Sequence, residues 1–165
     1  MKKNTALVVR GGVIAALYAG LTLISSALGL SFGPIQFRFS EALCVLPVFF
    51  PEAIPALTIG CLISNLASPF GLADIVFGTA ATLLSCLVSA WFKNVKVFKL
   101  PLLSLLSPVI FNAIIVGAEI SLLSGGSALL FATYALEVGA GELGVMAVLG
   151  VPLYFWLNKR LTKRV

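Results

Sequence analysis

The sequence predicts an all-α membrane protein in which six transmembrane helices form one compact bundle. Hydrophobic residues make up 60% of the 165 residues and charged residues only 10%, too few to cover a surface that faces water. Uncharged apolar stretches recur, and several exceed the roughly 18–20 residues that a helix needs to cross a bilayer. Short alternating segments, which are typical of membrane barrels, are absent. We therefore expect a single integral membrane domain over residues 1–165.

The first helix is expected over residues 6–28. Basic residues mark its start, and Gly29 with a following Gly-Pro pair marks its end, because glycine and proline terminate helices. After the loop, Ser40 can cap a second helix. Glu41 then lies in the first turn of that helix, where the helix dipole favours an anion.

The stretch 41–67 is compatible with one long kinked helix or with two short helices folded back at "FFPEAIP". Pro51 and Pro55 interrupt the helical hydrogen-bond ladder, and Glu52 between them prefers water, so the sequence favours two short helices. Each would be about 16–22 Å long at ~1.5 Å per residue, which is less than the ~30 Å hydrocarbon core.

Turn signals separate the remaining helices. The loop "SPFGLAD" precedes the fourth helix, "KNVKVFK" follows it, Pro101 opens the fifth, and "SGGS" leads into the sixth. The sixth helix is about 40 Å long if it is continuous, so we expect it to be tilted. The six expected helices cover residues 6–28, 40–50, 52–66, 74–92, 101–123 and 131–157.

The distribution of basic residues predicts the topology. Six spans place both termini on one side of the membrane, and ten of the eleven basic residues fall on that side, leaving only Arg38 on the other. The positive-inside rule then places both termini in the cytoplasm. A chain with five helices would place one lysine-containing cluster on the outer side of the membrane, so the charges also favour the hairpin of short helices. The ten residues are Lys2, Lys3, Arg10, Lys93, Lys96, Lys99, Lys159, Arg160, Lys163 and Arg164.

Acidic residues gather at the opposite, outer end of the expected bundle. An ionisable group in hydrocarbon costs about 2.5–3.5 kcal/mol even on a lenient scale, and it marks a site that faces the bundle interior. Other roles stay open, such as an interfacial helix N-terminus for Asp74 or an interhelical hydrogen bond for Asn112. The candidate substrate-binding residues are Arg38, Glu41, Asn65, Asp74, Asn112, Glu119, Glu137 and Glu142.

The residue types at this end indicate capture of a small solute rather than catalysis. The chain has no histidine, its three cysteines lack CxxC spacing, and no glycine-rich phosphate loop occurs. We therefore expect no enzyme activity, no metal and no cofactor. The excess of carboxylates favours a ligand that is cationic or rich in N–H donors. The topology explains the +5 net charge, so no nucleic-acid partner is expected.

Small residues recur at four-residue spacing along the first helix. Such stripes let another helix pack closely in lipid. They suit packing within the bundle and docking of a separate protein equally well. The candidate docking residues are Gly12, Ala15, Ala16 and Ala19, with Gly11 and Gly20 on the same two stripes.

Four segments stand in order along the chain: "GPIQFRFSEAL", "LPVFFPEAIPALTIGCLISNL", "LADIVFGTAATLLS" and "EVGAGELG". In sequence and spacing they resemble the QueT family, the substrate-binding (S) components of energy-coupling factor (ECF) transporters for queuosine precursors. The resemblance covers about residues 7–157, and its first two segments are the most specific.

This resemblance implies six helices, cytoplasmic termini and a binding pocket on the outer side. It also implies that Ala15 and Ala19 form an AxxxA-like motif that docks a membrane-embedded coupling subunit, which joins two cytoplasmic ATPases. The implied ligand is a deazaguanine base such as queuine or its aminomethyl precursor.

A deazaguanine fits the acidic end of the bundle. Its guanine-like edge carries an N1–H and an exocyclic amine, which one carboxylate can accept together, and an aminomethyl arm needs a second carboxylate. We expect Glu142 or Glu137 to bind the guanine edge. Glu119 or Asp74 would bind the amine.

We expect Arg38 and Glu41 to form the entrance, where an incoming solute is first held. The ring carbonyl needs a donor, which Arg38, Asn65 or Asn112 can supply. Two alternatives remain open. The chain could be an S component for another small vitamin-like solute, or an autonomous carrier whose two sixth-helix carboxylates relay protons.

Overall fold

The computed structural model describes residues 3–32 and 35–162, and every named element in this part of the chain is a helix. The Gly-Pro pair at 33–34 and three of the basic residues, Lys2, Lys163 and Arg164, lie outside the described residues. The elements in chain order are α1 (Lys3–Ala27), η1 (Phe39–Val48), α2 (Ala53–Asn65), α3 (Leu72–Trp91), α4 (Leu102–Phe111), η2 (Asn112–Val116), α5 (Gly117–Leu123), α6 (Ala128–Val145), η3 (Met146–Gly150) and α7 (Val151–Thr162).

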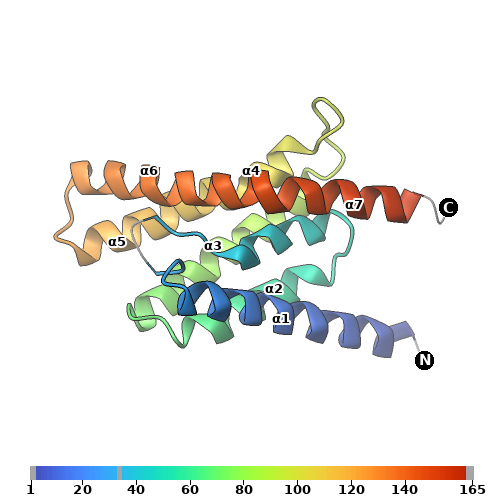
Figure 1. The fold of residues 1–165 in the computed structure, drawn as a ribbon, viewed down its shortest axis with the longest axis horizontal. Coiled ribbons are helices and arrows are strands. Elements are labelled where there is room, and N and C mark those ends of the chain that lie inside the picture. Colours follow the sequence, from blue (N-terminus) through green and yellow to red (C-terminus); the bar gives the residue numbers. More distant parts are fainter. Residues whose placement is uncertain (1–2, 33–34, 163–165) are drawn as a thin grey trace.

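Six helical segments result within the described ranges, because η2 joins α4 to α5 and η3 joins α6 to α7 without a break. The all-helical class is therefore confirmed. Figure 1 shows that α1 begins and α7 ends at the same end of the bundle, which we call the terminal end. The connection between α5 and α6 lies at the other end, which we call the outer end. Four segments are long and apolar enough to cross a membrane: Asn4–Ala27, Leu72–Trp91, Leu102–Leu123 and Ala128–Thr162.

The hairpin of short helices consists of η1 and α2. The segment η1 is a 3₁₀-helix that contains Pro47, and it packs against α1 and α3 inside the bundle. Glu41, which the sequence places at the start of the second helix near the outer face, is only 1% exposed. Helical periodicity places Glu41 in a first turn, but it does not say that the whole turn is folded into the interior.

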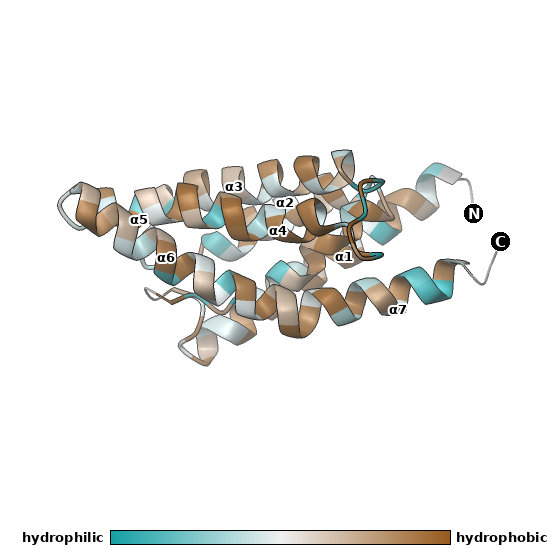
Figure 2. Cartoon of the chain, turned by 90° about the horizontal axis from the view of Figure 1, so that it is seen from above, coloured by the Kyte–Doolittle hydropathy of each residue, from teal (hydrophilic) through white to brown (hydrophobic). Residues whose placement is uncertain are grey.

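Polarity is arranged opposite to that of a water-soluble protein. Buried residues include Thr22, Ser25 and Ser85, whereas large apolar side chains such as Leu72 (79%) and Leu136 (75%) are exposed. Figure 2 shows that hydrophobic residues recur along the whole length of the long helices. An apolar exterior over helices of spanning length suits a hydrocarbon environment.

Small residues let the helices approach closely. Ser107 Oγ donates to the carbonyl oxygen of Ser85 across the α3–α4 contact at 2.9 Å. On the α1–α2 contact, a methyl group added at Gly60 would lie 2.7 Å from the carbonyl oxygen of Ala15. Glycine is therefore required at position 60 for the observed packing.

The segments Leu102–Leu123 and Ala128–Thr162 each contain one π-helical turn. In η2 this turn begins at Asn112, and it precedes the part of α5 that carries Glu119. A π turn shifts the residues that follow it around the helix, and such turns are frequent at functional sites. Both side chains still face the interior, with 3% and 2% exposure.

Candidate functional site

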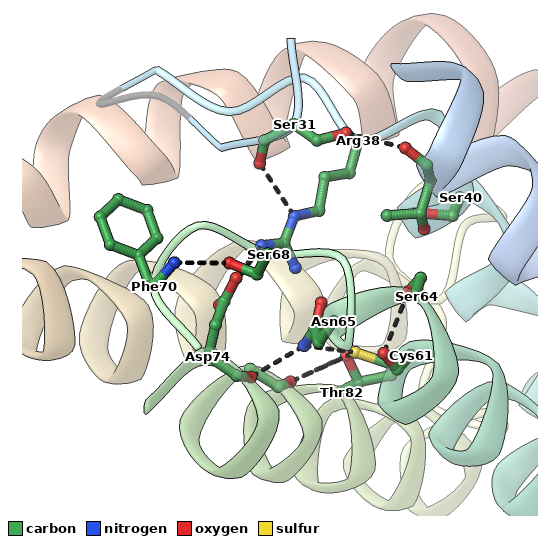
Figure 3. A network of polar contacts seen from close by, with 12 residues as sticks. Ser31, Arg38, Ser40, Cys61, Ser64, Asn65, Ser68, Phe70, Asp74 and Thr82 are labelled. Atoms are coloured by element: carbon green, nitrogen blue, oxygen red, sulfur yellow. Dashed lines mark hydrogen bonds and ion pairs between the residues drawn. The ribbon is translucent and has the colours of Figure 1, made fainter. Parts of the chain in front are cut away.

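A buried ion pair joins the loop after α1 to the start of α3. Arg38 Nη2 lies 3.4 and 3.3 Å from the two carboxylate oxygens of Asp74, and both side chains are almost completely buried. Arg38 Nε also donates to the carbonyl oxygen of Ser31 at 3.1 Å, and its guanidinium lies over the ring of Phe32. Figure 3 shows Arg38 between Ser31 and Asp74.

Arg38 keeps its positive charge in this environment. Burial alone would lower the pKa of the guanidinium, but the carboxylate of Asp74 outweighs that effect and raises the pKa above its usual value. The positive charge is therefore a permanent feature of the loop.

Asn65, at the end of α2, contacts the turn of α3 that carries Asp74. Its Nδ2 donates to the backbone carbonyl oxygen of Asp74 at 2.8 Å (Figure 3). A methyl group at Gly78 would lie 2.7 Å from Asn65 Nδ2 and 3.1 Å from Asp74 Oδ1. Glycine at position 78 thus leaves the space in which these two side chains meet.

Glu41 is the centre of a second group of contacts, deeper in the bundle. The hydroxyl of Tyr18 donates to Glu41 Oε1, while Cys44 Sγ and Asn112 Nδ2 donate to Oε2 at 3.3 and 3.4 Å. The Tyr18 hydroxyl also lies 3.5 Å from Thr82 Oγ1. Both oxygens of this carboxylate are therefore occupied by protein donors.

Glu142 on α6 faces the same interior. It is 1% exposed, and its charged and polar neighbours include Glu41, Arg38 and Asn112. Its Oε2 has no hydrogen-bond partner among the described residues. The loop after α1 packs directly against the neighbouring Gly141, since a methyl group there would lie 2.2 Å from the carbonyl oxygen of Gln36.

Glu119 on α5 is 2% exposed and lies near Asp74 and Arg38. Neither of its carboxylate oxygens has a partner in the part of the chain that the structure describes. Glu137 differs from the other candidates. It is half-buried, with one unpartnered oxygen, and no contact with the remaining candidate residues is described.

The structure therefore brings together the predicted site residues other than Glu137, for which no contact with them is described. Several of the buried polar atoms in and around this cluster lack a partner, although buried polar groups in proteins are nearly always paired. Within residues 3–32 and 35–162 the unpartnered atoms are Gln36 Nε2, Asn65 Oδ1, Thr79 Oγ1, Glu119 Oε1 and Oε2, Glu137 Oε2 and Glu142 Oε2.

Three members of the cluster were missed by the sequence analysis: Tyr18, Gln36 and Thr82. A signal for Tyr18 was present, because Tyr18, Thr22 and Ser25 recur at helical spacing on one face of an otherwise apolar helix. Gln36 carried no such signal, since its burial depends on the contact between its backbone and Gly141.

A different kind of surface lies at the terminal end, between α1 and α2. A groove of about 460 Å³ is lined by Leu7, Val8, Gly11, Gly12, Ala15, Glu52, Pro55, Ala56 and Ile59. We call it the α1–α2 groove. Arg10 pairs with Glu52 beside it at 2.6 Å. Of the candidate docking residues, Gly12 and Ala15 line the groove, whereas Ala16 is exposed next to it and Ala19 lies half-buried outside it.

The described side chains include no group of three or more His, Cys, Asp or Glu residues placed to hold a metal ion. The cluster at the outer end is thus a set of hydrogen-bonding groups and charges.

Comparison with known proteins gives one family and one relative. The family model described as QueT transporter matches residues 8–159. A protein described as "Queuosine precursor transporter QueT", from Lactococcus lactis subsp. cremoris (strain MG1363), is 43% identical over 82 residues. The match covers 50% of this chain and 48% of the relative, so the chain aligns with about half of that protein's length. No solved structure gives a significant match.

Proposed function

The chain belongs to the QueT transporter family, and from this premise we propose that it is the substrate-binding membrane subunit of an ATP-driven importer. The family is one of transporters and not of enzymes, which agrees with the absence of catalytic motifs in the sequence. The proposed solute is a queuosine precursor with a deazaguanine ring, as the printed name of the Lactococcus lactis relative suggests.

The observation that carries the proposal is the excess of unpartnered acceptors in the buried cluster. Carboxylate or amide oxygens of Glu119, Glu142 and Asn65 lack donors, whereas the amide nitrogen of Gln36 lacks an acceptor. Leaving such groups buried and unpaired is unfavourable by about 1–3 kcal/mol each, and more for charged groups. A ligand with several N–H donors and one carbonyl would satisfy them.

A deazaguanine has this pattern. We assign its N1–H and exocyclic amine to Glu142, whose Oε2 is free, and its cationic aminomethyl arm to Glu119, whose two oxygens are both free. Gln36 Nε2 is available for the ring carbonyl. Glu41 holds the site in shape instead of binding the base, because Tyr18 and its other donors already occupy its two oxygens.

The cluster is buried, so a solute must enter past the segment that covers it. The closest cover is the contact between the Gln36 backbone and Gly141, reinforced by the Arg38–Asp74 pair. We propose that entry opens the first contact while the second keeps the loop attached to α3. In this proposal Arg38 holds the loop at the entrance.

Energy must come from outside the chain, since the sequence contains no phosphate-binding loop. The α1–α2 groove is apolar and lies beside small residues, which favours close packing of a helix from another membrane protein. We propose that the coupling subunit of an ECF complex, joined to two cytoplasmic ATPases, docks there. The terminal end would then face the cytoplasm, in line with its lysines and arginines.

The test is calorimetric titration of the purified chain with queuine, its aminomethyl precursor, guanine and an unrelated vitamin. The proposal predicts saturable binding of the deazaguanines and weaker or no binding of the others. Binding of the vitamin alone would contradict the substrate assignment. In proteoliposomes, uptake should require the coupling subunit and ATPases, whereas uptake by the chain alone along a pH gradient would favour the carrier alternative.

A further inference from the structure

The connection between α3 and α4 forms a strained hairpin, residues 92–100, which we call the lysine hairpin. Val97 N donates to the Leu100 carbonyl oxygen at 2.8 Å, and Leu100 N donates to the Val97 carbonyl oxygen at 3.0 Å. The two residues between them have left-handed backbones, with φ of 51° at Phe98 and 67° at Lys99. Two-residue turns of this kind favour Asn and Gly, and a bulky residue with positive φ is strained.

The strain places an aromatic side chain at the tip of the lysine hairpin. Phe98 is 91% exposed, and Trp91 at the end of α3 is 83% exposed. Val95 and Val97 between them are also exposed. The hairpin projects sideways from the bundle and not along its long axis, as Figure 1 shows above α4 and Figure 2 shows in front of the helices.

Positive charge accompanies these apolar side chains. Lys93, Lys96 and Lys99 lie on the lysine hairpin and form no salt bridge among the described residues. The acidic residue nearest the terminal end, Glu52, is already paired with Arg10. The hairpin thus presents aromatic and aliphatic side chains together with uncompensated positive charge.

We propose that the lysine hairpin is a membrane anchor that binds anionic phospholipid at the terminal end of the bundle. Phe98 and Trp91 would enter the interfacial layer, which aromatic side chains favour, while the three lysines reach the phosphate groups of the lipid. A sideways projection at the end of a membrane-spanning bundle runs along the membrane surface. This surface is independent of the proposed solute.

A protein partner is the less favoured occupant, because α1 and α2, whose residues line the α1–α2 groove, lie on the opposite side of the bundle from the lysine hairpin (Figure 1). A subunit docked on that groove leaves the hairpin facing lipid. The lysine hairpin would therefore contact lipid on one side of the bundle, while the partner subunit contacts the opposite side.

The test uses the full chain with Trp91→Phe, Trp156→Phe and Phe98→Trp, which leaves one indole, at the tip of the hairpin. In vesicles of phosphatidylcholine and phosphatidylglycerol brominated near the headgroup, we expect the lipid bromines to quench its fluorescence and aqueous iodide to have little effect. Adding Lys93→Gln, Lys96→Gln and Lys99→Gln should reduce the bromine quenching by roughly half or more, because each lysine near an anionic surface contributes to attraction. High salt should act in the same direction.

A matched control removes exposed charge at the same end but away from the hairpin: Lys159→Gln with Arg160→Gln on α7 should leave the quenching unchanged. Iodide quenching without bromine quenching would overturn the anchor. Bromine quenching that stays the same without phosphatidylglycerol and without the three lysines would overturn the role of anionic lipid. Protection from iodide that arises only after the coupling subunit and ATPases are added would show a protein interface instead.

Discussion

The outer and terminal ends of the bundle each contain an ion pair, and the two pairs lie in opposite environments. The side chains of Arg38 and Asp74 are 3% and 1% exposed, next to further carboxylates without partners. Those of Arg10 and Glu52 are 48% and 16% exposed, next to an apolar groove. Charge at the outer end is therefore retained against a large desolvation penalty. Charge at the terminal end is placed where water can reach it.

The largest difference between the two ends should appear when one partner of each ion pair is neutralised. Asp74→Asn leaves the Arg38 guanidinium buried without its counter-ion, which should lower the free energy of unfolding by about 3–5 kcal/mol. Glu52→Gln at the exposed pair should change it by about 1 kcal/mol or less. Thermal unfolding of the detergent-solubilised variants measures both. Equal losses would show that burial does not distinguish the pairs.

The second test separates two carboxylates of the same helix. Glu142→Gln should weaken deazaguanine binding by about ten- to a hundredfold, since a hydrogen bond to a charged group contributes about 1.5–3 kcal/mol. Glu137→Gln, outside the cluster, should change affinity by less than about threefold. Calorimetry on the two variants decides the assignment, and the reverse order of effects would move the base to Glu137.

The third test concerns the cover of the cluster. Gly141→Ala places a methyl group 2.2 Å from the Gln36 carbonyl oxygen and should push the loop away, at about 1–3 kcal/mol for overpacking. Hydrogen exchange at the Phe37 amide, which donates to the Leu30 carbonyl oxygen, should become faster. Gly20→Ala is the control, because nothing lies within 4 Å of the added methyl group. Unchanged exchange in Gly141→Ala would show that this contact does not hold the loop.

A smaller effect is expected from Tyr18→Phe, which removes one donor to the Glu41 carboxylate. Substrate affinity should fall by about three- to tenfold, because Glu41 retains its contacts with Cys44 and Asn112. Tyr154→Phe removes a hydroxyl from a tyrosine of the apolar core and should leave affinity unchanged. A tenfold or greater loss in Tyr154→Phe alone would argue that affinity follows general packing and not the polar cluster.

The smallest effect on substrate binding is expected at the terminal end. Gly12→Leu adds a side chain to the lining of the α1–α2 groove, at a position where no atom lies within 4 Å of an added Cβ. Binding to the isolated chain should stay the same, while uptake by the reconstituted complex should be largely lost. Gly20→Leu, outside the groove, should preserve uptake. Lost substrate binding in Gly12→Leu would mean that the two ends are not separate in function.

Much of the fold could be predicted from the sequence because it depends on local signals. Pro51 lies in the turn between η1 and α2, whereas Pro55 is accommodated in the first turn of α2. The long apolar runs match the long helices of the structure. The 3₁₀ geometry of η1 and the depth of Glu41 could not be predicted, since both follow from how η1 packs between α1 and α3.

The residue types of the candidate site could be predicted from the sequence, but which of these residues lie together in the fold could not. Glu137 and Glu142 are five residues apart, which at ~100° per residue separates them by roughly 140° around the helix, so only one can face the cluster. The sequence left both open. The contact of Gln36 with Gly141 joins segments far apart in the chain, and no local sequence pattern predicts it.

The most direct test is a crystal structure of the chain with a bound deazaguanine. The account predicts that the base lies in the buried cluster, with Glu142 Oε2 within about 3.2 Å of a ring or amine nitrogen and Glu119 facing any aminomethyl arm. A base bound in the α1–α2 groove, with Glu119 and Glu142 still unpartnered, would contradict it.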